Sequence, residues 1–394
     1  MRHMFPRNSV GDDGVPERTM HEFDPPPRTR IGPADEAVER VLNGLDAEEV
    51  VVVTDDGVRQ AGVVDAVVDR LDPQPTVDDD VAPNPSVGTV RSVAATVRGT
   101  DAVVAVGGGS VMDAAKVACA LPAFGGEFET LRASAPEERP PAPETAIPLV
   151  LVPTTAGTGT ETGHWAVVSD HAADRKLSVG HPALRAEAAV LDPGLTESLP
   201  PYLTAATGFD VLAHAIESLT ATGASAFTRP HSREAYRLAT EHLQRAFENG
   251  SDAEARKRML EASYLAGLAM NNAGLGAVHG ISHAIGGLYD TPHGHTNALL
   301  LPHVVRANAR RSEAARTGYA RLVGDADDPG ERLAERIEDL LTSTDLDGDL
   351  PGAPADWDWD AVAERAVGNV NTETNPASLS RRDVVAVCER AFEN

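Results

Sequence analysis

Histidines and one aspartate in the C-terminal half of the chain have the spacing of metal ligands. Asp210 and His214, in the segment GFDVLAHAIE, are four residues apart, and so are His279 and His283 in VHGISHAIGG. On a helix, this spacing puts two side chains on one face, about 5 to 6 Å apart. His293 follows in a Pro-His-Gly turn, a rigid place to present an imidazole. The pattern predicts a cation site.

The candidate ligands combine one carboxylate with three imidazoles: Asp210, His214, His279 and His293. Such a set suits Fe²⁺ or Zn²⁺, which accept both nitrogen and oxygen ligands. A single histidine on an apolar helix face is more often a core residue. Five of the 13 histidines, however, fall between residues 279 and 303, and two pairs have helical spacing. We therefore interpret the four residues as a metal site.

A cation in such a site would act as a Lewis acid towards a substrate oxygen. His283 lies one helical turn from His279 and is the candidate catalytic residue, as a proton relay between the site and solvent. A structural role, orienting the ligands, explains it equally well. His295 and His303 are interpreted as pocket-rim or structural residues.

Three glycines in the N-terminal half have the character of a phosphate-binding turn. Gly107, Gly108, Gly109 and Ser110 follow a β-branched run at 102–106. Glycines let the backbone approach a pyrophosphate, and the helix expected to follow, with Ser110 as its N-cap, would supply free N–H groups and a positive dipole. The spacing is not GxGxxG, so a plain strand-to-helix turn explains the glycines equally well.

Two further signals favour a dinucleotide. Asp55 follows the buried run at 49–54, where a carboxylate can accept a hydrogen bond from a ribose 2′-OH and repel a 2′-phosphate, so NAD is favoured over NADP. A helix N-cap or turn role would also explain Asp55. The second signal is the loop at 153–160, which follows the run at 147–152 and is rich in hydroxyl groups. Its hydroxyl and amide groups suit a phosphate or a ribose. Lys176 is one of only three lysines, so we favour a cofactor contact over a surface role.

The elements that would position these residues differ between the two halves. Strand-like runs at 49–54, 102–106 and 147–152 alternate with helical patterns at 61–71 and 111–121, which indicates a parallel sheet with helical crossovers. Residues 122–147 are expected to form a surface excursion.

From Pro200 onward, long amphipathic helices replace the strand signals, at about 201–220, 231–248 and 252–272 and beyond. The predicted class is an α/β, Rossmann-like dinucleotide-binding domain at 20–198, followed by an all-helical metal and substrate domain at 199–394. Residues 1–19 lack the apolar stretch of a signal peptide and are expected to be a disordered leader, with Met20 as a candidate start.

Composition narrows the class of protein. The net charge of -26 disfavours nucleic acid and anionic membranes as partners, and two cysteines cannot build a disulfide framework. No apolar run approaches the roughly 20 residues that span a bilayer. We therefore expect a cytoplasmic protein. The acid excess and scarcity of lysine are typical of a halophilic protein, although an acidic protein from a GC-rich genome would also show them.

From about Met20 to the C-terminus, the chain resembles the iron-containing (group III) alcohol dehydrogenase family. The matching segments are PNP at 83–85, AVGGGSVMDAAK at 105–116, PTTAGTGTE at 153–161, GFDVLAHAIE at 208–217 and NNAGLGAVHGISHAIGGLYDTPHGHTNALLLPHV at 271–304. The last two are long and specific. The resemblance implies a dehydroquinate synthase-like fold, a small alcohol, aldehyde or ketone as substrate, NAD and one divalent metal as cofactors, and a homo-oligomer, a dimer or larger.

The resemblance also implies roles for individual residues. Asp210, His214, His279 and His293 would hold the metal, and the active site would lie in the cleft between the two domains. The NAD site would be lined by Asp55, Asn84, Gly108, Gly109, Ser110, Asp113, Thr154, Thr155, Thr158 and Lys176. The substrate-facing positions would be Trp165, Val167, Met270 and Asn371.

The chain departs from the family where relatives often continue the threonine loop with a Ser-Glu-Val-Thr-like sequence. It has Thr160-Glu161-Thr162-Gly163-His164-Trp165 instead, and a bulky Trp165 would favour a short substrate.

Three alternative functions remain at this stage. A maleylacetate reductase is related but needs no metal, which the retained Asp210 and Pro-His-Gly histidine disfavour. A lyase of the dehydroquinate synthase type would need a basic pocket for a phosphate-rich substrate, which this acidic chain does not suggest. The third alternative is a noncatalytic metal or nucleotide binder.

Overall fold

The computed structural model describes residues 23–126, 128–131, 146–171 and 175–392. The expected leader at 1–19 and Met20 lie outside these residues. The chain forms two compact units. Pro25–Leu199 and Gly250–Leu260 belong to an α/β unit, and Pro200–Asn249 and Glu261–Asn394 belong to a helical unit.

A six-stranded sheet is the centre of the α/β unit, and every neighbouring pair of its strands is parallel. The alternation of strand and helix signals in the sequence therefore predicted the architecture of this unit correctly. The spatial order of the strands is β1 (Arg28–Ile31), β8 (Ala188–Leu191), β5 (Leu149–Pro153), β4 (Ala102–Gly107), β2 (Val50–Val53) and β3 (Thr76–Asp78).

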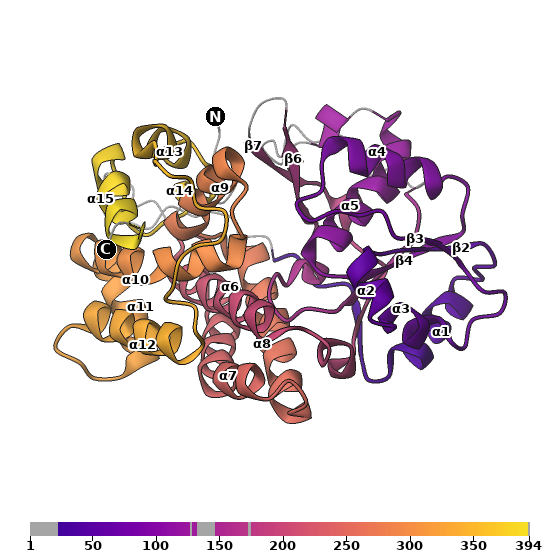
Figure 1. The fold of residues 1–394 in the computed structure, drawn as a ribbon, viewed down its shortest axis with the longest axis horizontal. Coiled ribbons are helices and arrows are strands. Elements are labelled where there is room, and N and C mark those ends of the chain that lie inside the picture. Colours follow the sequence, from indigo (N-terminus) through magenta and orange to yellow (C-terminus); the bar gives the residue numbers. More distant parts are fainter. Residues whose placement is uncertain (1–22, 127, 132–145, 172–174, 393–394) are drawn as a thin grey trace. The chain divides into compact units, whose positions relative to one another are not determined.

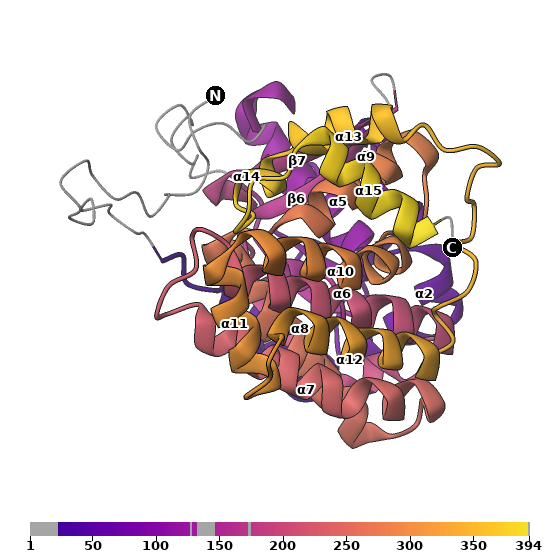
Figure 2. The same cartoon turned by 90° about the vertical axis from the view of Figure 1, so that its left-hand side faces the viewer.

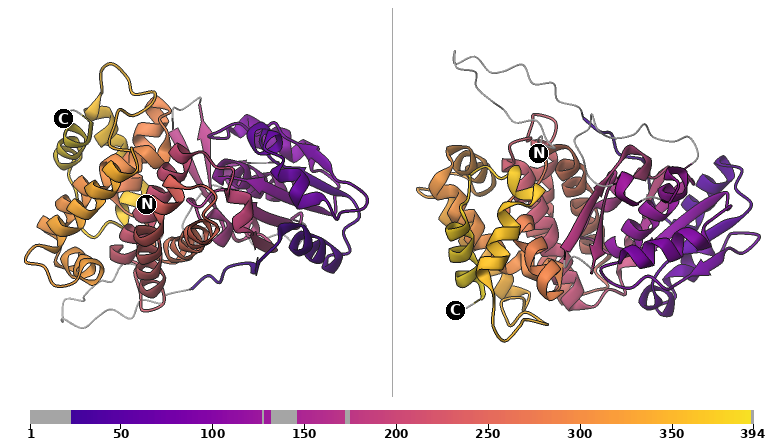
Figure 3. Two further views of the ribbon diagram at one scale, coloured as in Figure 1. Left: turned by 60° about the horizontal axis from the view of Figure 1, so that its bottom comes forward. Right: turned by 90° about the horizontal axis from the view of Figure 1, so that it is seen from above.

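The central strands are apolar on both faces because helices cover both (Figures 1 and 3). Val52 and Val104 lie in one buried cluster with α1 (Ala34–Gly44) and α3 (Val63–Val68). Their neighbours Val51 and Val103 lie in a second cluster with α4 (Val87–Thr96) and α5 (Gly109–Ala120). Successive side chains point to opposite faces of a strand, so both faces need valine-rich sequence.

Local details of the α/β unit differ from the prediction. The helix expected at 61–71 is the shorter α3 (Val63–Val68). A further helix, α2 (Asp56–Gln60), precedes it, and Gly62 between them is in the left-handed region at φ +73°. Gly108, rather than Ser110, is the N-cap of α5, so the helix begins two residues earlier than the sequence suggested.

An antiparallel pair, β6 (Trp165–Asp170) and β7 (Arg175–Gly180), was not predicted. Short 3₁₀ helices complete the unit: η1 (Leu121–Phe124), η2 (Phe128–Leu131), η4 (Thr160–Thr162), η5 (Pro182–Leu184) and η6 (Pro193–Thr196).

The helical unit contains long helices packed around a buried central one, α6 (Pro201–Thr220). Pro201 stands at the first position of this helix, where its missing N–H costs nothing. The other helices of this half of the chain are α7 (Arg229–Glu248), α8 (Ala253–Ala273), α9 (Ala277–Tyr289), α10 (His293–Arg311), α11 (Glu313–Val323), α12 (Pro329–Ser343), α13 (Trp359–Val367), α14 (Val370–Glu373) and α15 (Arg381–Phe392). The first part of α8, up to Leu260, belongs to the α/β unit.

Helices α7, α9 and α10 pack against α6, and Figure 2 shows α7, α6 and α10 side by side. From Val211 to Thr220 every residue of α6 is buried, including its polar ones. Polar side chains on such a buried helix need partners in the protein interior, and a metal ion can be one of these partners. Within the part of the chain that the structure describes, no helix has the length and apolar character to cross a bilayer.

Candidate metal centre and cofactor site

The predicted metal ligands come together inside the helical unit. Asp210 and His214 project from α6, His279 from α9 and His293 from the first position of α10. The ligand atoms of Asp210, His279 and His293 all lie within 4.8 Å of one another. His214 stacks on His279, with ring centroids 4.6 Å apart. Three helices thus converge on one point.

The distances between these atoms fit a metal site better than a hydrogen-bonded cluster. Oδ1 of Asp210 lies 3.4 Å from Nε2 of His279, and 3.6 Å from Nε2 of both His214 and His293. These separations exceed ordinary hydrogen-bond lengths. Ligands about 2.1 Å from a tetrahedral ion stand about 3.4 Å from one another. The spacing of the three imidazoles from Asp210 therefore fits a divalent cation.

The electrostatics of the cluster favour a cation as well. Burial would raise the pKa of Asp210, but His214, His279 and His293 lower it far below the usual range, so this carboxylate stays ionised. Burial would lower the pKa of His279, yet Asp210 and Glu217 raise it to about 9. A buried negative charge surrounded by imidazoles is the arrangement that a bound metal ion neutralises.

Glu217 is a functional residue that the sequence analysis missed. Its Oε2 accepts a hydrogen bond of 2.6 Å from Nδ1 of His279, and its Oε1 accepts one of 2.7 Å from the backbone N–H of Val278. A carboxylate on Nδ1 fixes the tautomer whose Nε2 lone pair is free for a metal. Nε2 of His279 is the atom that faces Asp210.

Asn297 and Ser282 hold the other side of the cluster. Nδ2 of Asn297 donates to Oδ1 of Asp210 at 2.8 Å and lies 3.1 Å from Nε2 of His293. Oδ1 of Asn297 is buried without a hydrogen-bond partner among the described residues. Oγ of Ser282 lies 2.9 Å from Nδ1 of His293 and orients that ring. Asp210 and His293 are therefore preset before any ligand binds.

Helical spacing could have identified these supporting residues. Glu217 follows His214 by three residues and Asp210 by seven, which puts it on the same face of α6. Asn297 follows His293 by four residues on α10. Only imidazoles and the first carboxylate were considered from the sequence, so the polar residues one turn away were overlooked.

His283 and Asn371, predicted as a proton relay and a substrate-facing residue, lie against each other. Nδ2 of Asn371 is 3.3 Å from Nδ1 of His283. The His283 ring centroid lies 5.3 Å from that of His293 and 6.1 Å from that of His279. His283 thus borders the metal cluster without belonging to it. Met270 is half-buried on α8 in the same unit.

In the α/β unit, the glycine turn and the threonine loop are in close contact. A Cβ on Gly109 would lie 2.6 Å from Cγ2 of Thr158, and one on Gly108 would lie 3.3 Å from Cγ2 of Thr155. The backbone N–H of Thr154 donates to Gly107 across β4 and β5. The glycines are therefore needed for the close approach of the two loops, in addition to any approach to a phosphate.

A buried hydroxyl at this junction fits a dinucleotide. Oγ1 of Thr155 has no hydrogen-bond partner among the described residues, although it lies at the carboxyl ends of parallel strands. Crevices at these ends are where open α/β sheets bind nucleotides. The junction of the two loops therefore suits the polar groups of a dinucleotide.

Asn84, Ser110 and Lys176 also come together. The backbone N–H of Asn84 donates to Oγ of Ser110 at 3.2 Å, and Nζ of Lys176 donates to Oδ1 of Asn84 at 2.9 Å. Asn84 has φ +53°, a left-handed conformation that asparagine tolerates well. Three residues separated by up to 92 positions therefore form one polar group beside the start of α5.

Asp55 and Asp113 have clear protein contacts of their own. Oδ1 of Asp55 accepts from the backbone N–H of Val58 at 2.9 Å and caps α2, one of the roles left open from the sequence. Both oxygens of Asp113 are engaged: Oδ1 with Oγ1 of Thr160 at 2.6 Å and Oδ2 with the backbone N–H of Val167 at 2.8 Å.

Trp165 and Val167, predicted to face the substrate, lie on β6. The Trp165 ring lies directly on Gly180 of β7, since a Cβ there would be 2.0 Å from Cζ3 of the indole. Glycine on β7 therefore makes room for the tryptophan. Both Trp165 and Val167 are half-buried.

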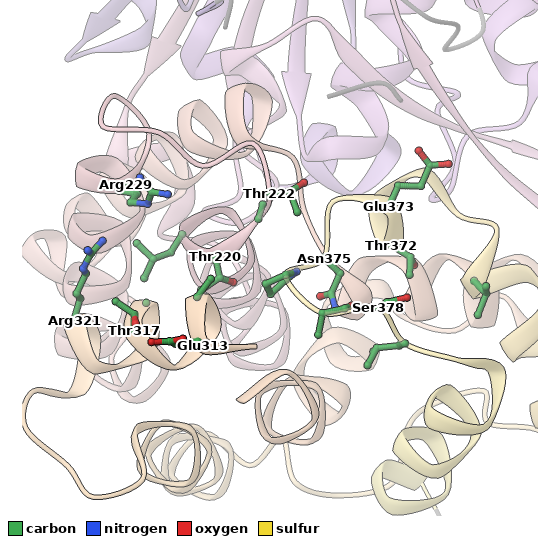
Figure 4. A pocket seen from close by; sticks show the side chains of 18 residues that line it. Thr220, Thr222, Arg229, Glu313, Thr317, Arg321, Thr372, Glu373, Asn375 and Ser378 are labelled. Carbon is green, nitrogen blue, oxygen red and sulfur yellow. The ribbon is translucent and has the colours of Figure 1, made fainter. Parts of the chain in front are cut away.

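The helical unit also contains a hollow of about 870 Å³ away from the predicted residues (Figure 4). Its lining includes Thr220 from the end of α6, Arg229 from the start of α7, and Glu313 and Arg321 from α11. None of the predicted metal, cofactor or substrate residues lines this hollow.

Known proteins resemble the chain over nearly its whole length. An NAD-dependent methanol dehydrogenase from Bacillus methanolicus is 32% identical over 95% of this chain and 100% of its own. An NADPH-dependent butanol dehydrogenase from Clostridium saccharobutylicum is 31% identical over 90% of this chain and 94% of its own. The crystal structure of a 1,3-propanediol oxidoreductase is 31% identical, with a TM-score of 0.85, and covers 95% of this chain and 100% of its own.

Sequence profiles of one family match both units. Residues 26–193 match the iron-containing alcohol dehydrogenase profile, and residues 204–392 match the C-terminal profile of the Fe-containing alcohol dehydrogenase family. The chain therefore belongs to the iron-containing alcohol dehydrogenase family.

Proposed function

We propose that this protein interconverts a small alcohol and its aldehyde or ketone, with NAD as the hydride carrier and Fe²⁺ or Zn²⁺ held by Asp210, His214, His279 and His293. As a family member it is a metal-dependent, nicotinamide-linked oxidoreductase. The observation that carries the proposal is the convergence of three imidazole Nε2 atoms within 3.4 to 3.6 Å of Oδ1 of Asp210.

The metal residues would act by presenting a fixed set of ligands. When both cofactors are bound, the metal supplies Lewis acidity to the substrate oxygen and the nicotinamide exchanges a hydride with the carbon that bears it. Glu217 keeps the proton of His279 on Nδ1, and Asn297 and Ser282 hold Asp210 and His293 in place. This order is built into the protein, so little reorganisation is needed on binding.

His283 is proposed to carry the substrate proton. Its ring borders His279 and His293, and Asn371 contacts its Nδ1. An imidazole changes its protonation near neutral pH and so can pass a proton onward. The contact with Asn371 would fix the orientation of the ring.

The choice of NAD over NADP is proposed on the basis of Asp55. The relatives named above include one NAD-dependent and one NADPH-dependent enzyme, so membership of the family does not decide the nucleotide. A carboxylate after β2 repels a 2′-phosphate and accepts from a 2′-OH. Oδ1 of Asp55 accepts from Val58, and a carboxylate oxygen can accept more than one hydrogen bond.

The deciding experiment uses purified protein stripped of metal and reloaded anaerobically with Fe²⁺ or Zn²⁺. Absorbance at 340 nm is followed with NAD⁺ and a panel of two- to four-carbon alcohols. We expect NADH formation that a chelator abolishes and metal restores. Chelator-resistant reduction of a keto-enoate would instead favour a metal-independent reductase, and metal binding without turnover would favour a noncatalytic binder.

Three wider expectations accompany the proposal. A homo-oligomer is tested by light scattering of the purified protein. The halophilic interpretation of the -26 charge is tested by the dependence of the unfolding midpoint on KCl, which should rise with salt. A cytoplasmic location remains a prediction from the sequence.

A further inference from the structure

Lys116 is a buried cation that the proposed chemistry does not use. It lies on α5, has no exposed surface, and is one of three lysines in the chain, with Lys176 and Lys257. An ammonium group in the interior is costly unless every donor is satisfied. The burial of a lysine in the core of an acidic protein therefore indicates a specific role.

All three donors of Lys116 are directed at one segment. Nζ donates to the carbonyl oxygen of Thr160, to Oγ1 of Thr160 at 2.9 Å, and to the carbonyl oxygen of Trp165 at 2.9 Å. An ammonium has three N–H groups, so its hydrogen-bonding capacity is fully used. The segment that it holds is the end of the threonine loop and the first residue of β6.

Asp113 reinforces this grip from the same face of α5, three residues before Lys116. Its two oxygens accept from Oγ1 of Thr160 and from the backbone N–H of Val167. Oγ1 of Thr160 therefore donates to Asp113 and accepts from Lys116. Helix α5 and the end of the threonine loop, which are more than 40 residues apart in the sequence, are thus joined through one hydroxyl.

The threonine loop also packs tightly against the glycine turn. Thr155 and Thr158 pack so closely on Gly108 and Gly109 that no Cβ can be added at Gly109. Gly109 is the first residue of α5, and Lys116 lies two turns further along this helix. Helix α5 thus acts as a rigid spacer that fixes both ends of the loop.

We propose that Lys116, with Asp113 and Thr160, is the positioning element of the cofactor site, holding the threonine loop at the distance from the glycine turn that NAD requires. This inference rests on the proposed function, since it takes the loop to be the NAD site. Lys116 touches neither cofactor nor substrate in this scheme. Asp113 accordingly acts through the loop and strand that it holds, rather than by contacting NAD.

The test compares the Kd for NAD⁺ in three variants of the full-length protein. Lys116→Met keeps the length of the side chain and removes the charge. Thr160→Val keeps the shape of its side chain and removes the bridging hydroxyl. Lys257→Met is the matched control, a half-buried lysine on α8. Calorimetry gives the Kd, and metal per chain is measured in parallel.

We expect Lys116→Met and Thr160→Val to raise the Kd and KM for NAD⁺ about tenfold or more while metal content stays at the native level. Lys257→Met should match the native protein. Thr160→Val changes only one methyl-sized group, so it tests the idea even if Lys116→Met fails to fold. A Kd within twofold of native in folded Thr160→Val would overturn the inference and leave Lys116 as a core residue only.

The two proposals fail in distinguishable ways. Native protein that does not bind NAD⁺ would overturn the proposed cofactor, and the inference with it. If native protein binds NAD⁺ and folded Thr160→Val binds it equally well, the inference alone is overturned.

Discussion

The metal centre and the cofactor region solve the problem of ligand binding in different ways. The candidate metal centre uses side chains on three helices, and Glu217, Ser282 and Asn297 orient His279, His293 and Asp210. The cofactor region uses backbone and hydroxyl groups in loops that follow β4 and β5, and its geometry depends on how the loops pack. In the metal centre, side chains are oriented separately by their own hydrogen bonds. In the cofactor region, the packing of the two loops positions all of their groups together.

This difference has a consequence for mutations. Removal of one ligand from the metal centre leaves the other helices in place, so the damage stays local. Removal of a contact in the cofactor region releases a loop, so several groups lose their positions together. Four substitutions test this comparison.

Asp210→Ala should lower turnover about 1,000-fold or more, because the only carboxylate in the predicted ligand set is lost. Metal retained per chain, measured by mass spectrometry, should fall to background. The Kd for NAD⁺ should stay within twofold of native, because Asp210 and the predicted NAD-binding residues lie in different units. Equal loss of metal and NAD⁺ would mean that the ligands or the domain boundary are wrongly assigned.

Glu161→Gln should change how stability depends on pH. Burial raises the pKa of Glu161 from its usual 4.5 to about 7, even though Lys116 opposes the shift. The folded protein therefore binds more protons than the unfolded chain between these values, and stability present below pH 4.5 is lost as pH rises through 7. A shift of this size corresponds to about 3 kcal/mol.

The measurement is the free energy of unfolding of native protein and Glu161→Gln at a fixed salt concentration. The variant should gain about 3 kcal/mol relative to native between pH 4 and pH 8. If the free energy of unfolding of the two proteins changed with pH in the same way, the Glu161 carboxylate would be ionised in the folded protein despite its burial.

Glu217→Gln should weaken metal binding about 10- to 100-fold, which is typical when a partner of a histidine ligand is altered. The amide oxygen can still accept from Val278, so the local fold is kept. Glu364→Gln, on an exposed carboxylate of the same unit, is the control. Metal competition with a coloured chelator gives the affinity, and an unchanged value would mean that Glu217 only supports the backbone of α9.

Asp55→Asn should reduce the preference for NAD⁺ over NADP⁺ about tenfold, through loss of the charge that repels a 2′-phosphate. Asparagine caps helices as well as aspartate does, so the contact with Val58 is retained. The ratio of kcat/KM values for the two cofactors is the readout. If the ratio does not change, Asp55 is a helix cap and nothing more.

The sequence predicted the residues that the structure brings together in the candidate metal centre because these residues obey a local rule. Asp210 with His214, and His279 with His283, lie on shared helix faces whatever the rest of the fold does. The pattern did not assign a different role to each member of the second pair, since spacing alone cannot say which imidazole points inward. The choice of His279 was an interpretation, and the structure places Nε2 of His279 3.4 Å from Oδ1 of Asp210.

The loops of the proposed cofactor region were also predicted from the sequence, but the contacts between them were not. The glycine turn and the threonine loop were found because parallel strands precede both. Their contact, the hairpin of β6 and β7, and the Asn84, Ser110 and Lys176 group all join residues distant along the chain. Local patterns contain no information about such pairings.

By itself, the sequence determined the two kinds of structure, the helix faces that bear the ligands and the family to which the chain belongs. Only the tertiary structure decided that Glu217 orients His279 and that Lys116 and Asp113 hold the threonine loop. The reason is physical: helical periodicity fixes which side chains share a face, whereas a hydrogen bond between elements depends on how those elements pack.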